Sequence, residues 1–266
     1  MWTRAELKSR GKVAMRANRV RTIMCAVFLS FAAQGIVFDS TGLTTAEIMN
    51  SFSGAEIIPL TQLLNLASTG LILTLICDIF FFNILEVGCR HFFVENARMP
   101  AKCGECLYSF RNRYWNTCLV MFLKGLYTFL WTCLFIVPGI VKAYAYRMVP
   151  YILADNPNLE YKEVISLSQE MMKGNKWKSF LLDLSFLGWN ILSTFTCGIL
   201  GFVYVYPYIY CTDAELYLKI RGPYLNEIHP DGYYDDDVDA GYGNDWYGYD
   251  DGYYDEPDRH DDDYYG

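Results

Sequence analysis

The sequence predicts an all-α fold: a polytopic transmembrane helical bundle of about six helices in three hairpins, followed by a disordered acidic tail. Three observations predict it. Residues 1–222 contain about six long apolar stretches and carry a net charge of +6, from 21 Lys and Arg against 15 Asp and Glu. Basic residues gather beside alternate stretches. Residues 223–266 carry a net charge of −14, from 1 basic against 15 acidic residues, and form a separate tail.

The apolar stretches are the predicted membrane spans, because a helix of about 18 or more apolar residues crosses a hydrocarbon core about 30 Å thick. The first three are long and nearly uncharged: residues 23–38, residues 57–85 with only Asp78, and residues 117–137 with only Lys124. The later three are shorter or carry charges, so that a tilted or partly buried helix is an alternative for each: residues 139–154, 180–195 and 198–217. Pro138 and Gly139 predict the outer turn after the third span, or a kink within one long helix.

The distribution of Lys and Arg predicts the orientation, because cytoplasmic loops beside membrane spans are enriched in these residues. Residues 1–22 hold seven basic residues against one acidic residue. Residues 39–56 hold no Lys or Arg, and residues 90–113 hold five. The N-terminus and the 90–113 segment are therefore predicted to be cytoplasmic, and alternation places residues 155–178 and the tail on the same side. The apolar part after the basic start lacks a small-residue cleavage site, which favours a retained anchor over a signal peptide.

Two cytoplasmic segments are predicted to be helices that lie at the membrane surface. In residues 156–174, Asn156 and Pro157 are typical of a helix start, and Gly174 offers a left-handed end. Lys176 and Trp177 then stand at the entry to the next span, where basic and aromatic residues are favoured. Residues 103–116 form the second amphipathic segment.

Residues 136–208 contain a succession of short motifs. They are Ile136-Val137-Pro138-Gly139-Ile140, Pro150-Tyr151-Ile152-Leu153-Ala154-Asp155, Met171-Met172-Lys173-Gly174, Lys176-Trp177, Ser185-Phe186-Leu187-Gly188-Trp189, Gly198-Ile199 and Pro207-Tyr208. Together they resemble a bacterial integral membrane family known as domain of unknown function 975. The resemblance implies a polytopic protein of the bacterial cytoplasmic membrane with no assigned reaction. It also implies structural roles for Pro138, Gly139, Gly174, Lys176, Trp177, Gly188, Trp189 and Pro207.

Four ionisable residues fall within or near the predicted spans: Asp78, Lys142, Arg147 and Asp183. Such groups are costly in hydrocarbon and usually face a bundle interior, a cavity or the interface. One interpretation is a polar pathway or lipid headgroup site, in which Asp78 is neutralised by a basic partner such as Lys142 or Arg147. The alternative is that Arg147 and Asp183 are interfacial and Asp78 only makes a packing contact.

The nine cysteines are scattered and do not form a disulfide framework. Cys103 and Cys106 form a CxxC pair, and Cys89 and His91 lie upstream on the same predicted side. These residue types bind zinc, but a structural zinc site normally shows two close ligand pairs in a compact domain. We therefore expect no metal, with Cys103 and Cys106 as weak candidates, and no cofactor.

The sequence contains no phosphate loop, nucleophile elbow or metalloprotease motif, which predicts that the protein is not an enzyme. The basic membrane part is explained by anionic lipid, so nucleic acid is not an expected partner. The tail holds ten Tyr and thirteen Asp, and it either recruits a basic cytoplasmic protein, is regulated by phosphorylation, or is only solvated. Two functions remain: a non-catalytic membrane protein that organises lipids or protein partners, or a transporter of small solutes or lipids with a polar site around Asp78.

Overall fold

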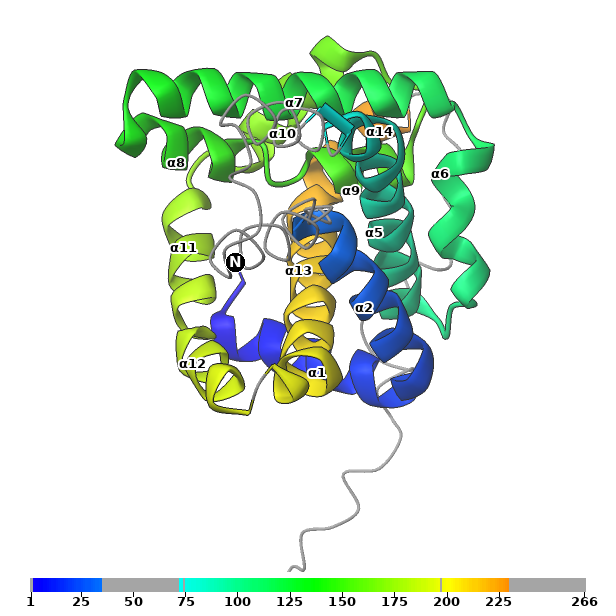
Figure 1. Cartoon of the computed structure of the whole chain (residues 1–266), viewed down its shortest axis with the longest axis vertical. Helices are drawn as coiled ribbons and strands as arrows, with labels where there is room; N and C mark the ends of the chain where they lie inside the picture. The colour runs from blue at the N-terminus through cyan, green and yellow to red at the C-terminus, as the bar shows by residue number, and fades with distance from the viewer. Residues whose placement is uncertain (1, 35–71, 74, 197, 230–266) are drawn as a thin grey trace, which may run out of the picture. The chain divides into compact units, whose positions relative to one another are not determined.

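The computed structural model describes residues 2–34, 72–73, 75–196 and 198–229, and every regular element in these ranges is a helix (Figure 1). The all-α prediction is confirmed for this part of the chain. Most of the predicted tail, residues 230–266, lies outside the described residues, as does much of the first hairpin between residues 35 and 71. The predicted spans at residues 23–38 and 57–85 are therefore only partly described.

Three helices form the centre of the described structure: α2 (Arg19–Gln34), α5 (Asn83–Arg98) and α13 (Tyr206–Arg221). Each packs against the other two, and α5 also packs against α9 (Val149–Asp155). Helix α5 is buried along most of its length, with Phe92 fully buried. A short π-helix, η1 (Asp78–Phe82), leads into α5. Burial of this apolar surface is the main stabilising contribution to the core.

The first helix of the chain, α1 (Arg4–Ala17), packs against α13 (Figure 1). Thr3 caps its N-terminus, because its hydroxyl accepts a hydrogen bond from the Glu6 amide at 3.3 Å. The Lys219 ammonium lies 2.9 Å from the Glu6 carboxylate, and this hydrogen bond lowers the Glu6 pKa. Arg10 lies 3.9 Å from the buried Glu215. The two ends of the described chain are thus joined by ion pairs.

Helix α7 (Tyr114–Leu134) and helix α8 (Ile136–Ala145) form a tight antiparallel hairpin. The chain reverses at Phe135, so the turn predicted at Pro138 and Gly139 is three residues too late. Pro138 fits the first turn of α8, where a helix needs no amide donor. A side chain at Gly139 would overlap Thr132 on α7, so this glycine permits the close approach of the two helices.

Two of the later predicted spans are each divided into two helices, and the third is continuous. Residues 139–154 divide into α8 and α9, because Pro150 has no amide to continue α8 and instead occupies the first turn of α9. Residues 180–195 divide into α11 (Lys176–Leu184) and α12 (Leu187–Phe195). The third, residues 198–217, is helical without a break from residue 199, because the π-helix η3 (Gly201–Val205) leads directly into α13, with the Tyr206 amide bonded to the Gly201 carbonyl.

The segment between α9 and α11 contains α10 (Tyr161–Met171). Its start was predicted at Asn156, but Glu160 is the N-cap and forms a reciprocal capping box with Glu163. Asn156 instead ends α9, and its side chain accepts a hydrogen bond from the Asn158 amide at 2.9 Å. Gly174 adopts the left-handed conformation, with φ of 81°, as the sequence predicted.

Two further segments connect or close these helices. Residues 103–116 form the 3-10 helix η2 (Cys103–Leu107), α6 (Tyr108–Arg111) and the first turn of α7. Residues 222–228, at the start of the predicted tail, form η4 (Gly222–Tyr224) and α14 (Leu225–Ile228). Ile228 is buried and its carbonyl accepts a hydrogen bond from Asn156 at 2.7 Å, so this part of the chain packs on the helices.

Candidate functional site

Arg147 joins two carboxylates from different helices. It lies in the turn between α8 and α9, whereas Asp183 lies on α11 and Asp213 on α13. Its Nη1 and Nη2 donate to the two Asp183 oxygens at 2.7 and 2.8 Å, and Nη2 also donates to Asp213 at 2.7 Å. The Tyr144 hydroxyl donates to Asp183 at 2.7 Å. Paired hydrogen bonds between a guanidinium and a carboxylate fix both groups in orientation and are stronger than neutral hydrogen bonds.

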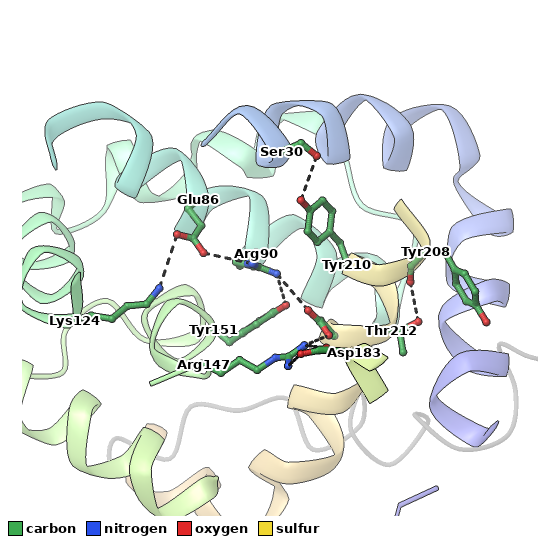
Figure 2. A network of polar contacts seen from close by, with 11 residues as sticks. Ser30, Glu86, Arg90, Lys124, Arg147, Tyr151, Asp183, Tyr208, Tyr210 and Thr212 are labelled. Atoms are coloured by element: carbon green, nitrogen blue, oxygen red, sulfur yellow. Dashed lines mark hydrogen bonds and ion pairs between the residues drawn. The ribbon is translucent and has the colours of Figure 1, made fainter. Parts of the chain in front are cut away.

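Arg90 on α5 continues this network from the other side of Asp213, with 3.9 Å between the Arg90 Nη1 and the carboxylate. The same Nη1 donates to the Tyr151 hydroxyl at 2.7 Å. The Arg90 Nη2 lies 3.4 Å from Glu86, one helical turn earlier, and the Lys124 ammonium on α7 lies 3.9 Å from Glu86. Figure 2 shows these groups in a continuous row from Lys124 to Asp183.

The network, which we call the ionic network, carries no net charge. It pairs three cations with three carboxylates: Lys124, Arg90 and Arg147 with Glu86, Asp183 and Asp213. Most of these side chains are shielded: Arg90 is 13% exposed and Asp213 is 9% exposed. Because a shielded charge is costly unless it is paired and hydrogen-bonded, mutual neutralisation allows these groups to lie between the helices. These contacts can fix the positions of six helices relative to one another: α5, α7, α8, α9, α11 and α13.

The structure brings only one of the three predicted site residues into the ionic network. Arg147 is its centre, with Asp183 and Asp213 as its partners. Lys142 lies on α8 with its ammonium 5.1 Å from the centre of the Trp131 ring, where it makes a cation–π contact. Asp78 lies in η1, half-buried, and its nearest described charge interaction is with Glu86. Among the described residues, the structure pairs Arg147 with Asp183 and Asp213 and not with Asp78.

Glu86, Arg90 and Asp213 were not predicted from the sequence as members of the ionic network. A signal was present, because Glu86 and Arg90 are four residues apart and therefore share a helix face. Tyr210 and Asp213 are likewise one turn apart on α13. The Arg90 guanidinium lies 5.3 Å from the Tyr210 ring centre, and the Tyr210 hydroxyl lies 3.2 Å from that of Ser30 on α2 (Figure 2).

A second buried cluster surrounds Asp155, the last residue of α9. Its carboxylate accepts hydrogen bonds from the Tyr217 hydroxyl at 2.6 Å and from Arg221 at 2.7 Å, and it lies 3.7 Å from Arg98. The Tyr217 ring stacks on Tyr151 with 5.2 Å between ring centres. This stacked pair joins the Asp155 cluster to the ionic network.

Acidification is expected to remove the contribution of Asp155 to stability. Burial alone would raise the pKa of this carboxyl, but the Arg221 and Arg98 guanidinium groups outweigh burial and hold the pKa below its ordinary value. An unfolded Asp has a pKa of about 3.9. The stabilisation by Asp155 is therefore complete at neutral pH, and it is lost as the pH falls through the lower pKa of the folded state. Unfolding of the wild type and of Asp155→Asn should be compared from neutral to acidic pH. The stability difference should shrink on acidification, and a constant difference would contradict the assignment.

The residues of the family motifs occupy turns and helix ends. Pro138 and Gly139 lie in the first turn of α8, and Pro207 in the first turn of α13. The others follow Gly174 in the sequence: Lys176 and Trp177 begin α11, and Gly188 and Trp189 lie in the first turn of α12. Trp177 is 68% exposed and stacks on Phe180. The interfacial position of Trp177 and the structural roles that the resemblance implies for these residues stay predictions.

The CxxC pair is divided between two environments. Cys106 is buried in η2, and its sulfur lies 3.1 Å from that of Cys25 on α2, whereas Cys103 is half-buried. His91 instead stacks on Tyr108 and contacts Glu105 at 3.6 Å. Within the described ranges, no group of three or more His, Cys, Asp or Glu residues is placed to hold a metal ion.

The described residues define an all-α protein with a buried ionic network and with one helix, α7, that is long and apolar enough to cross a membrane. Residues 133–223 match the model of a family described as Protein of unknown function (DUF975), which confirms the resemblance over that range. No curated protein and no solved structure matches the chain. The matched range contains Arg147, Asp183 and Asp213 but not Glu86, Arg90 or Lys124, so half of the ionic network lies outside it.

Proposed function

We propose that the chain is a multi-pass integral protein of the bacterial cytoplasmic membrane, with both termini cytoplasmic, that organises lipids or protein partners without catalysing a reaction. The observation that carries the proposal is an inverted distribution of polarity. Large apolar side chains face outward over the helical hairpins, whereas the charged side chains of the ionic network pair inside. Hydrocarbon favours this arrangement, because it accepts apolar surface and penalises unpaired charge.

The outward apolar surface is extensive. Only 22% of the apolar 18-residue stretch of α7 is buried. The exposed side chains continue around Phe135 into α8. Exposure reaches 73% at Val137 and 82% at Phe195, at the end of α12. Soluble monomers rarely expose contiguous apolar patches of more than a few hundred square ångströms. A lipid environment around these helices accounts for this surface, including the helices in the predicted fourth to sixth spans.

The basic N-terminal helix supports the orientation. Exposed guanidinium groups lie along α1 and at the start of α2: Arg4, Arg16, Arg19 and Arg21. Anionic lipid headgroups on the cytoplasmic face attract such residues, by about 1 kcal/mol for each. A 410 Å³ recess beside the start of α1 is lined by Thr3, Arg4, Ala5, Lys8 and Ser185. Two cations in one recess suit the phosphate of a lipid headgroup.

The pairing inside the ionic network favours an organising role over transport. Arg147 makes hydrogen bonds to two carboxylates at once, and Arg90 bonds a buried tyrosine. Groups that neutralise one another in fixed geometry hold helices together, whereas a transport site needs groups that bind a solute and release it. The acidic tail is then the part of the chain that recruits a basic cytoplasmic protein, through the opposite charge of the two surfaces.

Removal of the acidic tail is expected to release a protein partner and to leave bound lipid unchanged. The full chain and a version that ends at His229, which retains the packed α14, should be purified in native-lipid nanodiscs and their co-purifying lipids and proteins identified by mass spectrometry. A matched control carries the tail with its aspartates replaced by asparagine, which keeps length and aromatic content. A partner set that is the same in all three versions contradicts the tail as a recruiting site.

The membrane assignment has its own test in the same preparation. Membranes from the expressing cells should be washed at alkaline pH, and we expect the protein to stay in the pellet until detergent is added. Release by the alkaline wash would show peripheral attachment and would overturn the multi-pass proposal.

A transporter with a polar site at Asp78 is the second candidate function. The supporting observation is that Asp78 begins the π-helix η1, half-buried beside Glu86, and π-turns are frequent at functional sites. The buried Arg90 Nε has no hydrogen-bond partner among the described residues, which leaves a donor for a solute. In this case Asp78→Asn would lose a stoichiometric small molecule that co-purifies with the wild type. An organising protein would tolerate the substitution.

A further inference from the structure

Two cysteines that are distant in sequence lie side by side in the core. Cys25 is on α2 and Cys106 is in η2, 81 residues later, and their sulfur atoms are 3.1 Å apart. Both side chains are buried, with 1% and 6% exposure. A disulfide needs a sulfur–sulfur distance of about 2.05 Å, so a shift of about 1 Å would be enough to close the bond.

A third thiol and a close backbone contact fix the position of Cys106. The Cys89 thiol on α5 also interacts with the Cys106 sulfur. The adjacent Gly88 lies against the Cys106 carbonyl, where any side chain would overlap the backbone of η2. The interactions with Cys25 and Cys89 lower the pKa of Cys106, because they stabilise the thiolate. A thiolate is the nucleophilic form of cysteine.

These observations separate Cys106 from the other described cysteines. The Cys118 thiol donates to the carbonyl of Ile79 at 3.3 Å, and Cys133 is exposed on α7. Metal binding does not explain the cluster, because the described residues contain no group of three or more ligands placed to hold an ion. The geometry instead suits chemistry between two sulfur atoms.

We infer that Cys25 and Cys106 are a redox-active pair that a peroxide converts into a reversible disulfide, which joins α2 to η2. The Cys106 thiolate attacks one peroxide oxygen and the O–O bond breaks. The product is a sulfenic acid at Cys106, and the leaving oxygen takes a proton to depart as water or an alcohol. The Cys25 sulfur then attacks the Cys106 sulfur and displaces hydroxide, which leaves as water with the Cys25 proton. The two thiols together lose two electrons, and these electrons reduce one peroxide.

Burial determines the class of oxidant. A peroxide is small and uncharged and can reach a thiol that is 6% exposed, whereas a bulky disulfide reagent cannot approach its sulfur in line. The disulfide would fasten the segment before α7 to α2, and a dithiol would restore the reduced state. Because the pair lies within the helical core, the inference does not depend on the function of the acidic tail.

The test uses the full chain in native-lipid nanodiscs, reduced with dithiothreitol, freed of it and exposed to hydrogen peroxide. Free thiols are then blocked in denaturant, the protein is digested without reductant, and linked peptides are identified by mass spectrometry. We expect a peptide pair that joins Cys25 to Cys106 and that disappears on treatment with dithiothreitol. A link from Cys106 to Cys89 alone, or oxidation confined to Cys133, would overturn the assignment.

Variants test the order of the two steps. In Cys25→Ser, the sulfenic acid at Cys106 should persist and be captured by dimedone, whereas Cys106→Ser should lose both the adduct and the disulfide. Cys118→Ser removes another buried thiol and should leave the Cys25–Cys106 link at its wild-type level. Absence of a dimedone adduct at Cys106 in Cys25→Ser would overturn the peroxide step. The linked peptide of the wild type is informative even if a variant fails to fold.

Discussion

Replacement of Arg147 by alanine is expected to destabilise the protein by about 3–5 kcal/mol, the range found when one partner of a buried ion pair is removed. Arg147 donates hydrogen bonds to both Asp183 and Asp213, so its loss leaves two carboxylates close to one another without their shared cation. Arg90 remains 3.9 Å from Asp213 but already interacts with Glu86 and Tyr151. Arg90 therefore cannot neutralise both Asp183 and Asp213.

The free energy of unfolding should be measured for the purified protein in one defined detergent or lipid. Arg111→Ala is a suitable control, because Arg111 is exposed at the end of α6 and should change stability by less than about 0.5 kcal/mol. Arg147→Lys is informative as well, since an ammonium cannot bond both oxygens of Asp183 in the paired geometry and should recover only part of the loss. Equal stability of Arg147→Ala and Arg111→Ala would show that the ionic network does not hold the helices together.

Gly88→Ala is expected to destabilise the protein by about 3 kcal/mol, at the upper end of the range for overpacking. The new methyl group would overlap the carbonyl oxygen and carbon of Cys106, and a backbone cannot rotate away as a flexible side chain can. The segment η2 must therefore shift from α5. This shift should also separate the Cys106 sulfur from that of Cys25 and reduce the yield of their peroxide-induced link.

The control for this substitution is Gly104→Ala, in the same segment as Cys106 but with open space around the position of a side chain. We expect it to be close to the wild type in thermal unfolding and in the yield of the Cys25–Cys106 link. A Gly88→Ala protein that matches Gly104→Ala in both measurements would contradict the close approach of η2 to α5.

Local features of the sequence predicted local structure well. The apolar run from residue 117 identified most of α7, and Gly174 identified a left-handed turn, since both depend on neighbouring residues alone. The start of α10 at Glu160 was missed, because Asn156 and Pro157 carry an equally good capping pattern and in fact end the preceding helix. The breaks in the later spans follow from Pro150 and from packing at residues 185–186, which hydrophobicity does not report.

The composition of the ionic network could not be predicted from residue spacing. Arg147 lies 36 residues from Asp183 and 66 from Asp213, and several acidic residues at similar separations have the same local character. Spacing therefore allowed Asp78 as a partner of Arg147, whereas tertiary packing selects Asp183 and Asp213. Cys106 is a comparable case. The CxxC pattern pairs it with Cys103, whereas in the structure its sulfur contacts that of Cys25, which is 81 residues away.

The contact between α1 and α13 has a consequence for synthesis of the protein. Helix α1 is held by a helix that is synthesised much later, α13, through Glu6 with Lys219 and Arg10 with Glu215. Until residues 206–221 emerge from the ribosome, α1 therefore lacks α13, the helix against which it packs most extensively. A nascent chain arrested before residue 206 should accordingly leave α1 open to protease, whereas one arrested after the tail should protect it.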